Sequence, residues 1–545
     1  MLYREILRLL AFYLFGFAAI LLIPTLLAFY YQFYDPQHPQ PHSTLHFIYT
    51  FLVTLTLGAL CFYIGRSAKT RFYHREGIAA VVIIWLITPA LSALPFLFSQ
   101  TLTNPFQAYF EMVSGYTTTG ATVLQGKKYD PETGQEVPIK KTIRGVIDTE
   151  YVYYGNVNPV IQNGKVVVEG VEAISKALLF WRSFTQWLGG LGVVVLFVAI
   201  LPSLGIGGKL LYHTEVTGPV KEGISPRIQE AALQLWKIYL VLTFIQMGAL
   251  FLTNPQLDFL DVSTITFSTL STGGFSVKNM SIAAYGSFAT ELIVMIFMVL
   301  GSLNFTLYYY GFKGKFYKLY DPELFLYVVL ISLASFFIVM NLQGAPRMDL
   351  NGQAAGYFSW KEAVRYGIFQ TISAQTSTGF ATTNYDIWPY FSQVILLVVM
   401  FLGGMSGSTS GGIKVVRLYM LFRIAQYKVE SLFRPETIRS FRVAGKEVDT
   451  HAAGMVLIFF LLIIAISTLS TVLFVYDGAD PETSLGMVAC CINNVGFAFR
   501  MASPLDSFAF LSDGSLALAS LVMILGRLEF FAVLAVFIPA FWKQS

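Results

Sequence analysis

The amino-acid sequence predicts an all-α integral membrane protein with about ten transmembrane helices. Two observations carry this prediction. The 545 residues are 55% hydrophobic and only 12% charged, with a mean hydropathy of +0.61, whereas soluble globular domains carry about twice that charged fraction. The apolar residues also gather in runs that are long enough to cross a bilayer. Such a chain cannot cover itself with polar surface, so we place it in a membrane.

The transmembrane helices follow from the apolar runs in chain order. We expect them near 6–31, 45–65, 77–99, 177–201, 230–253, 288–311, 323–342, 391–424, 452–476 and 515–541. Arginines precede the first run, whose apolar core of about 25 residues is longer than that of a signal peptide. We therefore expect this run to be retained, and it forms an N-terminal helix pair with the second.

Basic residues lie in alternate connections between these runs. They occur within 4–8, 66–75, 209–227, 313–318 and 417–446, and at Lys543. With an even number of helices, all of these segments fall on one side of the membrane. The positive-inside rule makes that side the cytoplasm, so both termini are predicted to be cytoplasmic.

The opposite side holds four short apolar segments, at 104–116, 260–271, 360–376 and 482–493. Each is too short to span the bilayer and too apolar for a plain loop, which favours re-entrant helices. Asp261, Glu362 and Glu482 lie near three of the starts, where a carboxylate suits a helix N-terminus. One such segment alone would be better explained as a surface helix, but four in equivalent positions favour re-entrant elements.

One outer connection is different, because the sequence becomes polar from about 125 to 170. Within it, Asn163-Gly164 between apolar residues is a strong signal for a β-hairpin. The segment is therefore predicted to be a small β-rich extracellular insertion.

Each short segment ends in a glycine-centred stretch. The four stretches are Thr118-Thr119-Gly120, Ser271-Thr272-Gly273, Ser377-Thr378-Gly379 and Asn494-Val495-Gly496. Their glycines recur every 105–120 residues or so once the insertion is subtracted, and a fixed period indicates internal repeats. We expect an N-terminal helix pair at 1–70 and four repeats of helix, pore loop and helix, at 71–228, 229–320, 321–448 and 449–545.

Four such repeats around an axis would bring the four stretches together around a central pore. Rings of backbone carbonyls replace the hydration shell of a cation without fixed charge, and glycine lets the backbone crowd the axis. The C-terminal ends of the short helices would also favour a cation. The alternative is that small residues merely let membrane helices pack closely. That alternative suits one isolated stretch, but packing alone does not require a period.

The eighth apolar run is interrupted by glycine and serine, which makes a continuous helix costly. Unwound backbone at membrane depth must line a cavity or be buried in protein, so we predict a gating loop below the pore stretches. A kinked helix is the alternative, whereas a phosphate-binding loop lacks its required spacing. Arg527 lies inside an apolar span, where an arginine indicates function by default, although an ion pair with a neighbouring helix is its alternative. The predicted gate residues are Gly403, Gly404, Gly407, Ser408, Gly411, Gly412, Lys414 and Arg527.

These motifs resemble those of the Trk/Ktr/HKT superfamily of potassium transporters. The resemblance rests on "SGYTTTGATVL", "STLSTGGFSV", "QTSTGFATTNYDIWP", "NNVGFAF", "FWRSFTQWLGGLGVVVL" and "GGMSGSTSGGIKVVR". The N-terminal helix pair is similar to that of TrkH-type pore subunits. The resemblance implies K⁺ bound at the four stretches, a homodimer with one pore in each protomer, and a TrkA-like cytoplasmic nucleotide-binding regulatory subunit. It also implies that the protein lies in a bacterial cytoplasmic (inner) membrane and that the gating loop pairs with Arg527.

Within this superfamily, glycine at every filter position goes with a preference for potassium. The insertion and the fourth stretch, with Val495 and Phe497, depart from the family pattern. A poorly selective monovalent cation transporter therefore remains an alternative. A secondary transporter for a small solute is another, although inverted repeats with charged midplane sites are typical of that class. Whether a proton or sodium ion is coupled to potassium movement stays open.

Other functions are disfavoured by what the sequence lacks. Cys61, Cys490 and Cys491 give neither a disulfide framework nor a zinc spacing. No grouping of catalytic residues stands out, so we expect no enzyme, no organic cofactor and no nucleic-acid partner. The basic inner connection 417–449 is predicted to bind the regulator or anionic lipid.

Overall fold

The computed structural model describes residues 3–68, 74–130, 133–144, 148–162, 165–192, 228–348, 354–433, 442–443, 446–447, 450–504 and 506–542. These residues are mostly helical, as predicted. The helices are α1 (Tyr3–Phe33), α2 (Thr44–Gly65), α3 (His74–Phe98), α4 (Pro105–Tyr116), α5 (Lys176–Gly190), α8 (Ile228–Thr253), α9 (Phe259–Leu270), α10 (Phe288–Ser302), α11 (Phe305–Phe312), α12 (Pro322–Leu342), α13 (Trp360–Gln375), α14 (Tyr390–Leu402), α15 (Val415–Phe433), α16 (Thr450–Tyr476), α17 (Pro481–Asn493), α18 (Asp513–Arg527), α19 (Phe531–Phe537) and α20 (Pro539–Trp542).

Within the described residues, six helices are long and apolar enough to cross a membrane, namely α1, α2, α3, α8, α12 and α16. The pair α10 and α11 would be a seventh span, although it bends by 93°. Each of the ten predicted runs contains helix, but the number of crossings stays a prediction. The predicted segment 193–201 and the basic residues within 209–227 lie outside the described residues.

Within the described residues, three of the predicted runs are interrupted, and only one of these interruptions was predicted. The break between α14 and α15 lies at the glycine-rich segment, as expected. The bend between α10 and α11 was missed, because its cause lies in another part of the chain. Carbonyl oxygens at the end of α10 accept from the glycine-rich segment, with Met405 N donating to Ser302 O at 3.0 Å. The break after α18 was also missed, and there Glu529 and Phe530 have φ of 58° and 63°.

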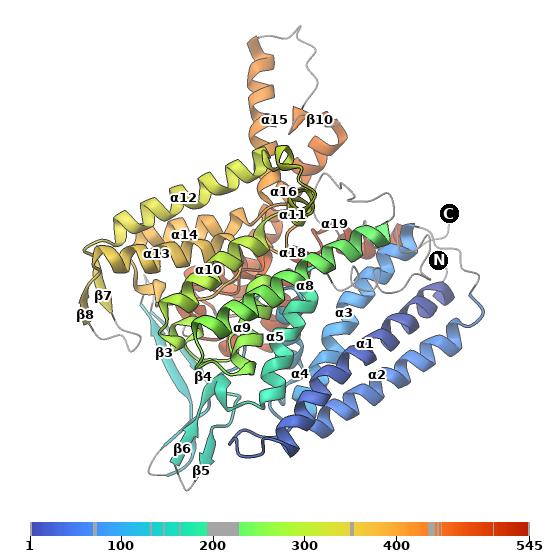
Figure 1. Ribbon diagram of the computed structural model, residues 1–545, viewed down its shortest axis with the longest axis vertical. Coiled ribbons are helices and arrows are strands. Elements are labelled where there is room, and N and C mark those ends of the chain that lie inside the picture. Colours follow the sequence, from blue (N-terminus) through green and yellow to red (C-terminus); the bar gives the residue numbers. More distant parts are fainter. Residues whose placement is uncertain are drawn as a thin grey trace.

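The four short apolar segments are helices α4, α9, α13 and α17, each with a side-chain cap at its start. The cap side chains accept hydrogen bonds from backbone N–H groups that would otherwise lack a partner. Asp261, Glu362 and Glu482 lie in the first turns, as predicted. Helix α4 lies beside α3, α9 beside α5, and α13 beside α12 and α14 (Figure 1), and α17 packs against α18.

Antiparallel strands confirm the predicted β-rich insertion. The pairs are β1 (Lys128–Tyr129) with β2 (Glu136–Val137), β3 (Ile139–Ile143) with β4 (Thr149–Tyr153), and β5 (Val160–Gln162) with β6 (Lys165–Val168). Gln162 pairs with Lys165, which is the register that the hairpin signal predicts, although Asn163 and Gly164 themselves lie outside the described residues. Two further pairs were not predicted, β7 (Pro346–Met348) with β8 (Ala354–Tyr357) and β9 (Arg442–Val443) with β10 (Lys446–Glu447).

The insertion is attached to the last quarter of the chain. The Tyr151 hydroxyl donates to Asp480 Oδ2 at 2.7 Å and accepts from Asp480 N at 2.7 Å. Burial raises the pKa of Tyr151 to about 12, so its phenol remains a donor at physiological pH. Lys141 Nζ lies 2.5 Å from Asp506 Oδ2. The insertion is therefore fixed against the helical body.

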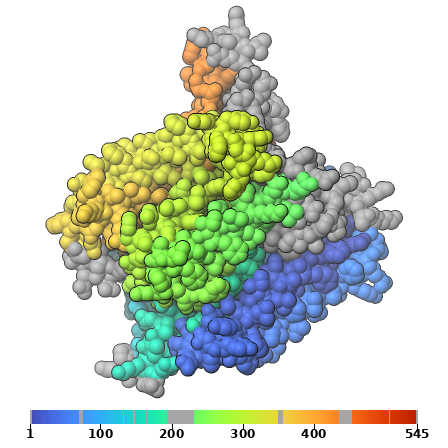
Figure 2. Space-filling view, viewed as in Figure 1, coloured from blue at the N-terminus to red at the C-terminus, as the bar shows by residue number. Residues whose placement is uncertain are grey.

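The strands of the insertion and helix α15 project from opposite ends of the helical body (Figure 2). The two ends of the chain lie near each other, on the side of the molecule that holds α1–α3 (Figure 1).

Candidate functional site

The chain follows the same backbone path after each of the four short helices. In every stretch one N–H group bonds back five residues, Thr119 to Ser114 O (2.9 Å), Gly273 to Ser268 O (2.8 Å), Thr378 to Ser373 O (2.9 Å) and Val495 to Cys490 O (3.0 Å). The residues before them have positive φ, at Thr118 (55°), Thr272 (53°), Ser377 (55°) and Asn494 (53°). Positive φ is uncommon outside glycine, and its recurrence at one position means that the four stretches are built alike.

This correspondence corrects the prediction for the second stretch by one residue. The predicted match to the other stretches was Ser271, Thr272 and Gly273. In the structure the matching residues are Thr272, Gly273 and Gly274, and Gly274 has the positive φ of 78° that the other final glycines share. Two consecutive glycines made both registers acceptable in the sequence, and the hydrogen bond from Gly273 decides between them.

The final glycines close the four stretches into a ring. A Cβ atom on Gly120 would overlap the carbonyl oxygen of Gly273, and one on Gly274 would overlap that of Thr378. The same relation joins Gly379 to Val495 O and Gly496 to Thr119 O. Each stretch thus lies against the next, and the fourth returns to the first. Only glycine, which has no Cβ atom, lets the carbonyl oxygen of the next stretch come this close. The positive φ of the four residues is a second reason for glycine.

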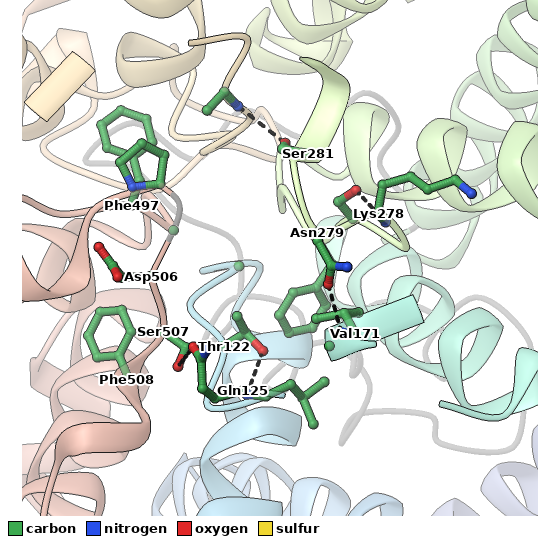
Figure 3. Close-up of a pocket in the computed structure, with 18 of the residues that line it drawn as sticks. Thr122, Gln125, Val171, Lys278, Asn279, Ser281, Phe497, Asp506, Ser507 and Phe508 are labelled. Atoms are coloured by element: carbon green, nitrogen blue, oxygen red, sulfur yellow. Dashed lines mark hydrogen bonds between the residues drawn. The ribbon is translucent and has the colours of Figure 1, made fainter. Parts of the chain in front are cut away.

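A cavity of about 280 Å³ lies on one side of the ring, and all four glycines line it. Its walls combine segments that are distant in the chain, including Thr122, Lys278, Phe497 and Asp506 (Figure 3). Both ends of the insertion contribute, through residues 124–128 and 169–171. The insertion therefore forms part of the mouth that leads to the ring.

The predicted gating loop lies against the other side of the ring, between α14 and α15. The Thr409 hydroxyl lies 2.9 Å from Leu270 O and 3.3 Å from the Thr272 hydroxyl. Gly411 N donates to the Ser377 hydroxyl at 2.7 Å. Gly403, Gly407 and Gly412 have φ of 67°, 70° and 76°, so the segment cannot be a kinked helix.

Arg527 joins this loop to the ring through hydrogen bonds, while its role in gating stays a prediction. Its Nη1 atom donates to Thr409 O at 2.8 Å and to the Thr118 hydroxyl at 3.2 Å. Its Nη2 atom donates to Gly189 O at 2.7 Å and to Gly190 O at 2.6 Å. One guanidinium group therefore bridges the loop, the first stretch and the end of α5.

The remaining predicted gate residues lie in or beside the loop. Lys414 is buried, and its ammonium group donates to Ser410 O at 2.6 Å. Gly404 N donates to the Ser410 hydroxyl, and the Ser408 hydroxyl donates to Met405 O. These bonds are internal to the segment and give the unwound chain a defined shape.

Three groups around this site were not predicted from the sequence. The first is Thr409, which lies among the predicted glycines and serines of the loop but was not itself predicted as a gate residue. Glu323 on α12 accepts from Ser406 N (2.7 Å) and Val416 N (3.1 Å), and so holds both flanks of the loop. On α5, Arg182 pairs with Glu111 at 2.7 Å in a fully buried network. The rule that drew attention to Arg527, a charge within apolar sequence, would also have found Arg182.

We expect Thr409→Val to raise basal cation flux about fivefold, because its hydroxyl bonds to Leu270 O and Gly301 O keep the loop against the ring. The measurement is tracer uptake into vesicles that contain the purified protein. The matched control is Thr468→Val, which removes an exposed hydroxyl that bonds Ile464 O within α16. Equal fluxes in the two variants would show that the Thr409 hydroxyl does not restrain the loop.

Comparisons with known proteins show the family of this chain. A family model described as TrkH, cation transport protein, matches residues 150–544. The Trk system potassium uptake protein TrkH of Vibrio parahaemolyticus is 31% identical over 554 residues, covering 99% of this chain and 100% of that protein. TrkG of Escherichia coli, also described as a Trk system potassium uptake protein, is 32% identical, and the match covers 92% of each chain. The crystal structure of the potassium transporter TrkH from Vibrio parahaemolyticus has a TM-score of 0.78 at 29% identity, with full coverage of both chains. This chain therefore belongs to the TrkH family of cation transport proteins.

Proposed function

We propose that this protein takes up potassium across a bacterial inner membrane through the ring of four glycine-centred stretches. The observation that carries the proposal is the closed ring itself, in which carbonyl oxygens of successive stretches lie beside successive glycines. Carbonyl rings of this kind replace the water around a potassium ion. The names of the relatives, Trk system potassium uptake proteins, support the same ion.

The chemistry of the pathway follows from these groups. Helices α4, α9, α13 and α17 end at the ring, so the partial negative charge of each C-terminus stabilises a cation there. A potassium ion would enter the cavity, exchange water for carbonyl oxygens at the ring, and continue past the gating loop. Inward movement is driven by the membrane potential, which contributes about 2.3 kcal/mol per charge for each 100 mV.

The gating loop is the barrier in this proposal. Thr409 and Gly411 contact the ring directly, and Arg527 attaches the loop to it. Opening would require these contacts to break. The helix α15 continues from the loop and projects beyond the helical body, so a protein that moves α15 would move the loop (Figure 1).

We propose that α15 and the connection after it bind a TrkA-like cytoplasmic nucleotide-binding subunit. Two observations support this proposal. Helix α15 projects from the helical body, and its apolar side chains Phe422, Leu432 and Phe433 are exposed. The protein would work as a homodimer with cytoplasmic termini. Scrambling the sequence of residues 418–449 is expected to abolish co-purification with the regulatory subunit. Cross-linking should still detect the dimer. Co-purification that survives the change would remove this docking surface.

The transport proposal is tested by cation uptake into liposomes that contain the purified protein. We expect potassium and rubidium to enter at least about tenfold faster than sodium and lithium, as a selective carbonyl ring requires. Equal fluxes would mean a general pathway for monovalent cations. An absence of cation flux, even with the regulatory subunit, would favour a transporter for a small solute.

A further inference from the structure

Gly273 differs from its counterparts in the ring. At the same level, the other three stretches have Thr119, Thr378 and Val495, which are all β-branched. A β-branched side chain stiffens the residue that carries it, whereas glycine leaves the backbone free to change conformation. Gly273 itself does not have the positive φ that characterises Gly274. The backbone at 273 would therefore accept a side chain, and the reason for glycine must be found among its neighbours.

That neighbour is Gln186 on α5. A Cβ atom placed on Gly273 would have three nearest atoms, and all three belong to the Gln186 side chain, at 2.5, 2.6 and 2.9 Å. Gln186 has no exposed surface. The Gln186 amide therefore fills the space beside Gly273 that the side chain of a threonine or valine at this position would need.

Gln186 also bonds the backbone on both sides of Gly274. Its Nε2 atom donates to Gly273 O at 2.7 Å, and its Oε1 atom accepts from Phe275 N at 3.1 Å. Both hydrogen bonds agree on the orientation of the amide. One turn earlier on the same helix, Arg182 donates to Ser276 O at 3.2 Å and lies 4.2 Å from the centre of the Phe275 ring. Gln186 and Arg182 of α5 together thus hold residues 273–276.

We propose that Gln186 is a positioning residue for the second stretch, which replaces the missing side chain of Gly273 and fixes the direction of its carbonyl group. Gly273 O is one of the four carbonyl oxygens that lie beside the glycines of the ring. The inference rests on the proposed function, since that oxygen is then a potassium ligand. A carbonyl oxygen has two lone pairs, so the bond from Gln186 leaves one for the ion.

The test measures the ratio of potassium to sodium uptake in liposomes, because this ratio does not depend on how much protein is folded. Gln186→Ala should lower the ratio about fivefold, as the loss of a buried hydrogen bond frees the carbonyl. Gln186→Met keeps the volume and removes both bonds, and it should lower the ratio by a similar factor. The matched control is Gln393→Ala on α14, outside the four stretches, which removes a buried amide that donates to Asp386 O and Trp388 O.

A second substitution tests whether a side chain at position 273 can take the place of the Gln186 amide. Gly273→Thr alone should reduce the ratio, because its side chain would overlap Gln186. In the Gln186→Ala background, Gly273→Thr should restore the ratio toward the wild-type value, and in the Gln186→Met background it should not. A rescue of this kind is a coupling that independent effects do not produce.

The outcomes separate this inference from the proposal on which it rests. A wild-type protein without potassium preference would overturn the proposed function. A selective wild-type protein whose ratio is unchanged in Gln186→Ala and Gln186→Met would overturn the positioning role alone. A double variant that is no more selective than Gln186→Ala would show that Gln186 does not replace a side chain.

Discussion

Replacing Arg527 with alanine is expected to raise potassium flux about tenfold in the absence of any regulatory partner. The side chain donates to Thr409 O in the gating loop and to the Thr118 hydroxyl in the ring. A hydrogen bond from a charged donor contributes about 1.5–3 kcal/mol, and each 1.4 kcal/mol or so changes an equilibrium tenfold. Losing the bond to Thr409 should therefore shift the loop away from the ring. Initial rates of rubidium uptake into liposomes measure the effect.

Two further variants sharpen this experiment. Arg527→Lys keeps the positive charge, but a single ammonium group cannot reproduce the fork that contacts Thr409, Gly189 and Gly190. A rise in flux with lysine would assign the restraint to the hydrogen bonds, whereas low flux with lysine would assign it to an electrostatic barrier. Arg423→Ala, at an exposed position on α15, is the control. Unchanged or reduced flux in folded Arg527→Ala protein would contradict the gating role.

Substituting alanine for Gly379 is expected to reduce potassium uptake at least about tenfold. Gly379 has φ of 88°, a conformation that costs an alanine roughly 1–2 kcal/mol. The new Cβ atom would also overlap Val495 O of the next stretch, so the ring would have to open. A carbonyl ring that is distorted at one corner should lose both rate and preference for potassium.

Gly344→Ala separates these two causes. Gly344 has φ of 74° with open space where a Cβ atom would lie, and it is located between α12 and β7, outside the ring. This control therefore has the backbone strain without the overlap. We expect its thermal stability to fall slightly and its uptake to stay at the wild-type level. Equal losses of uptake in the two variants would mean that strain, and not closure of the ring, explains the effect.

The sequence by itself determined the features that depend on local composition. Long apolar runs predict membrane helices because unpaired backbone is costly in lipid, and this holds whatever the neighbours are. The interruption at 403–412 followed from glycine content, and the strands at 125–170 followed from polarity and a hairpin signal. The importance of Arg527 could also be predicted, because a charged side chain within an apolar run needs polar partners.

Only the tertiary structure decided which atoms meet. The sequence allows either Thr272-Gly273-Gly274 or Ser271-Thr272-Gly273 as the second stretch, and the hydrogen bond from Gly273 N shows which one matches the others. The ring then closes at Gly274 because Thr378 O of the next stretch lies beside it. The bend after α10 depends on bonds from Met405 and Thr409, about a hundred residues away in the sequence. Gln186 was one polar residue among many in α5 until its amide was seen against Gly273 and Phe275. The closing of the ring, the bend after α10 and the bonds of Gln186 all join parts of the chain that no local pattern connects.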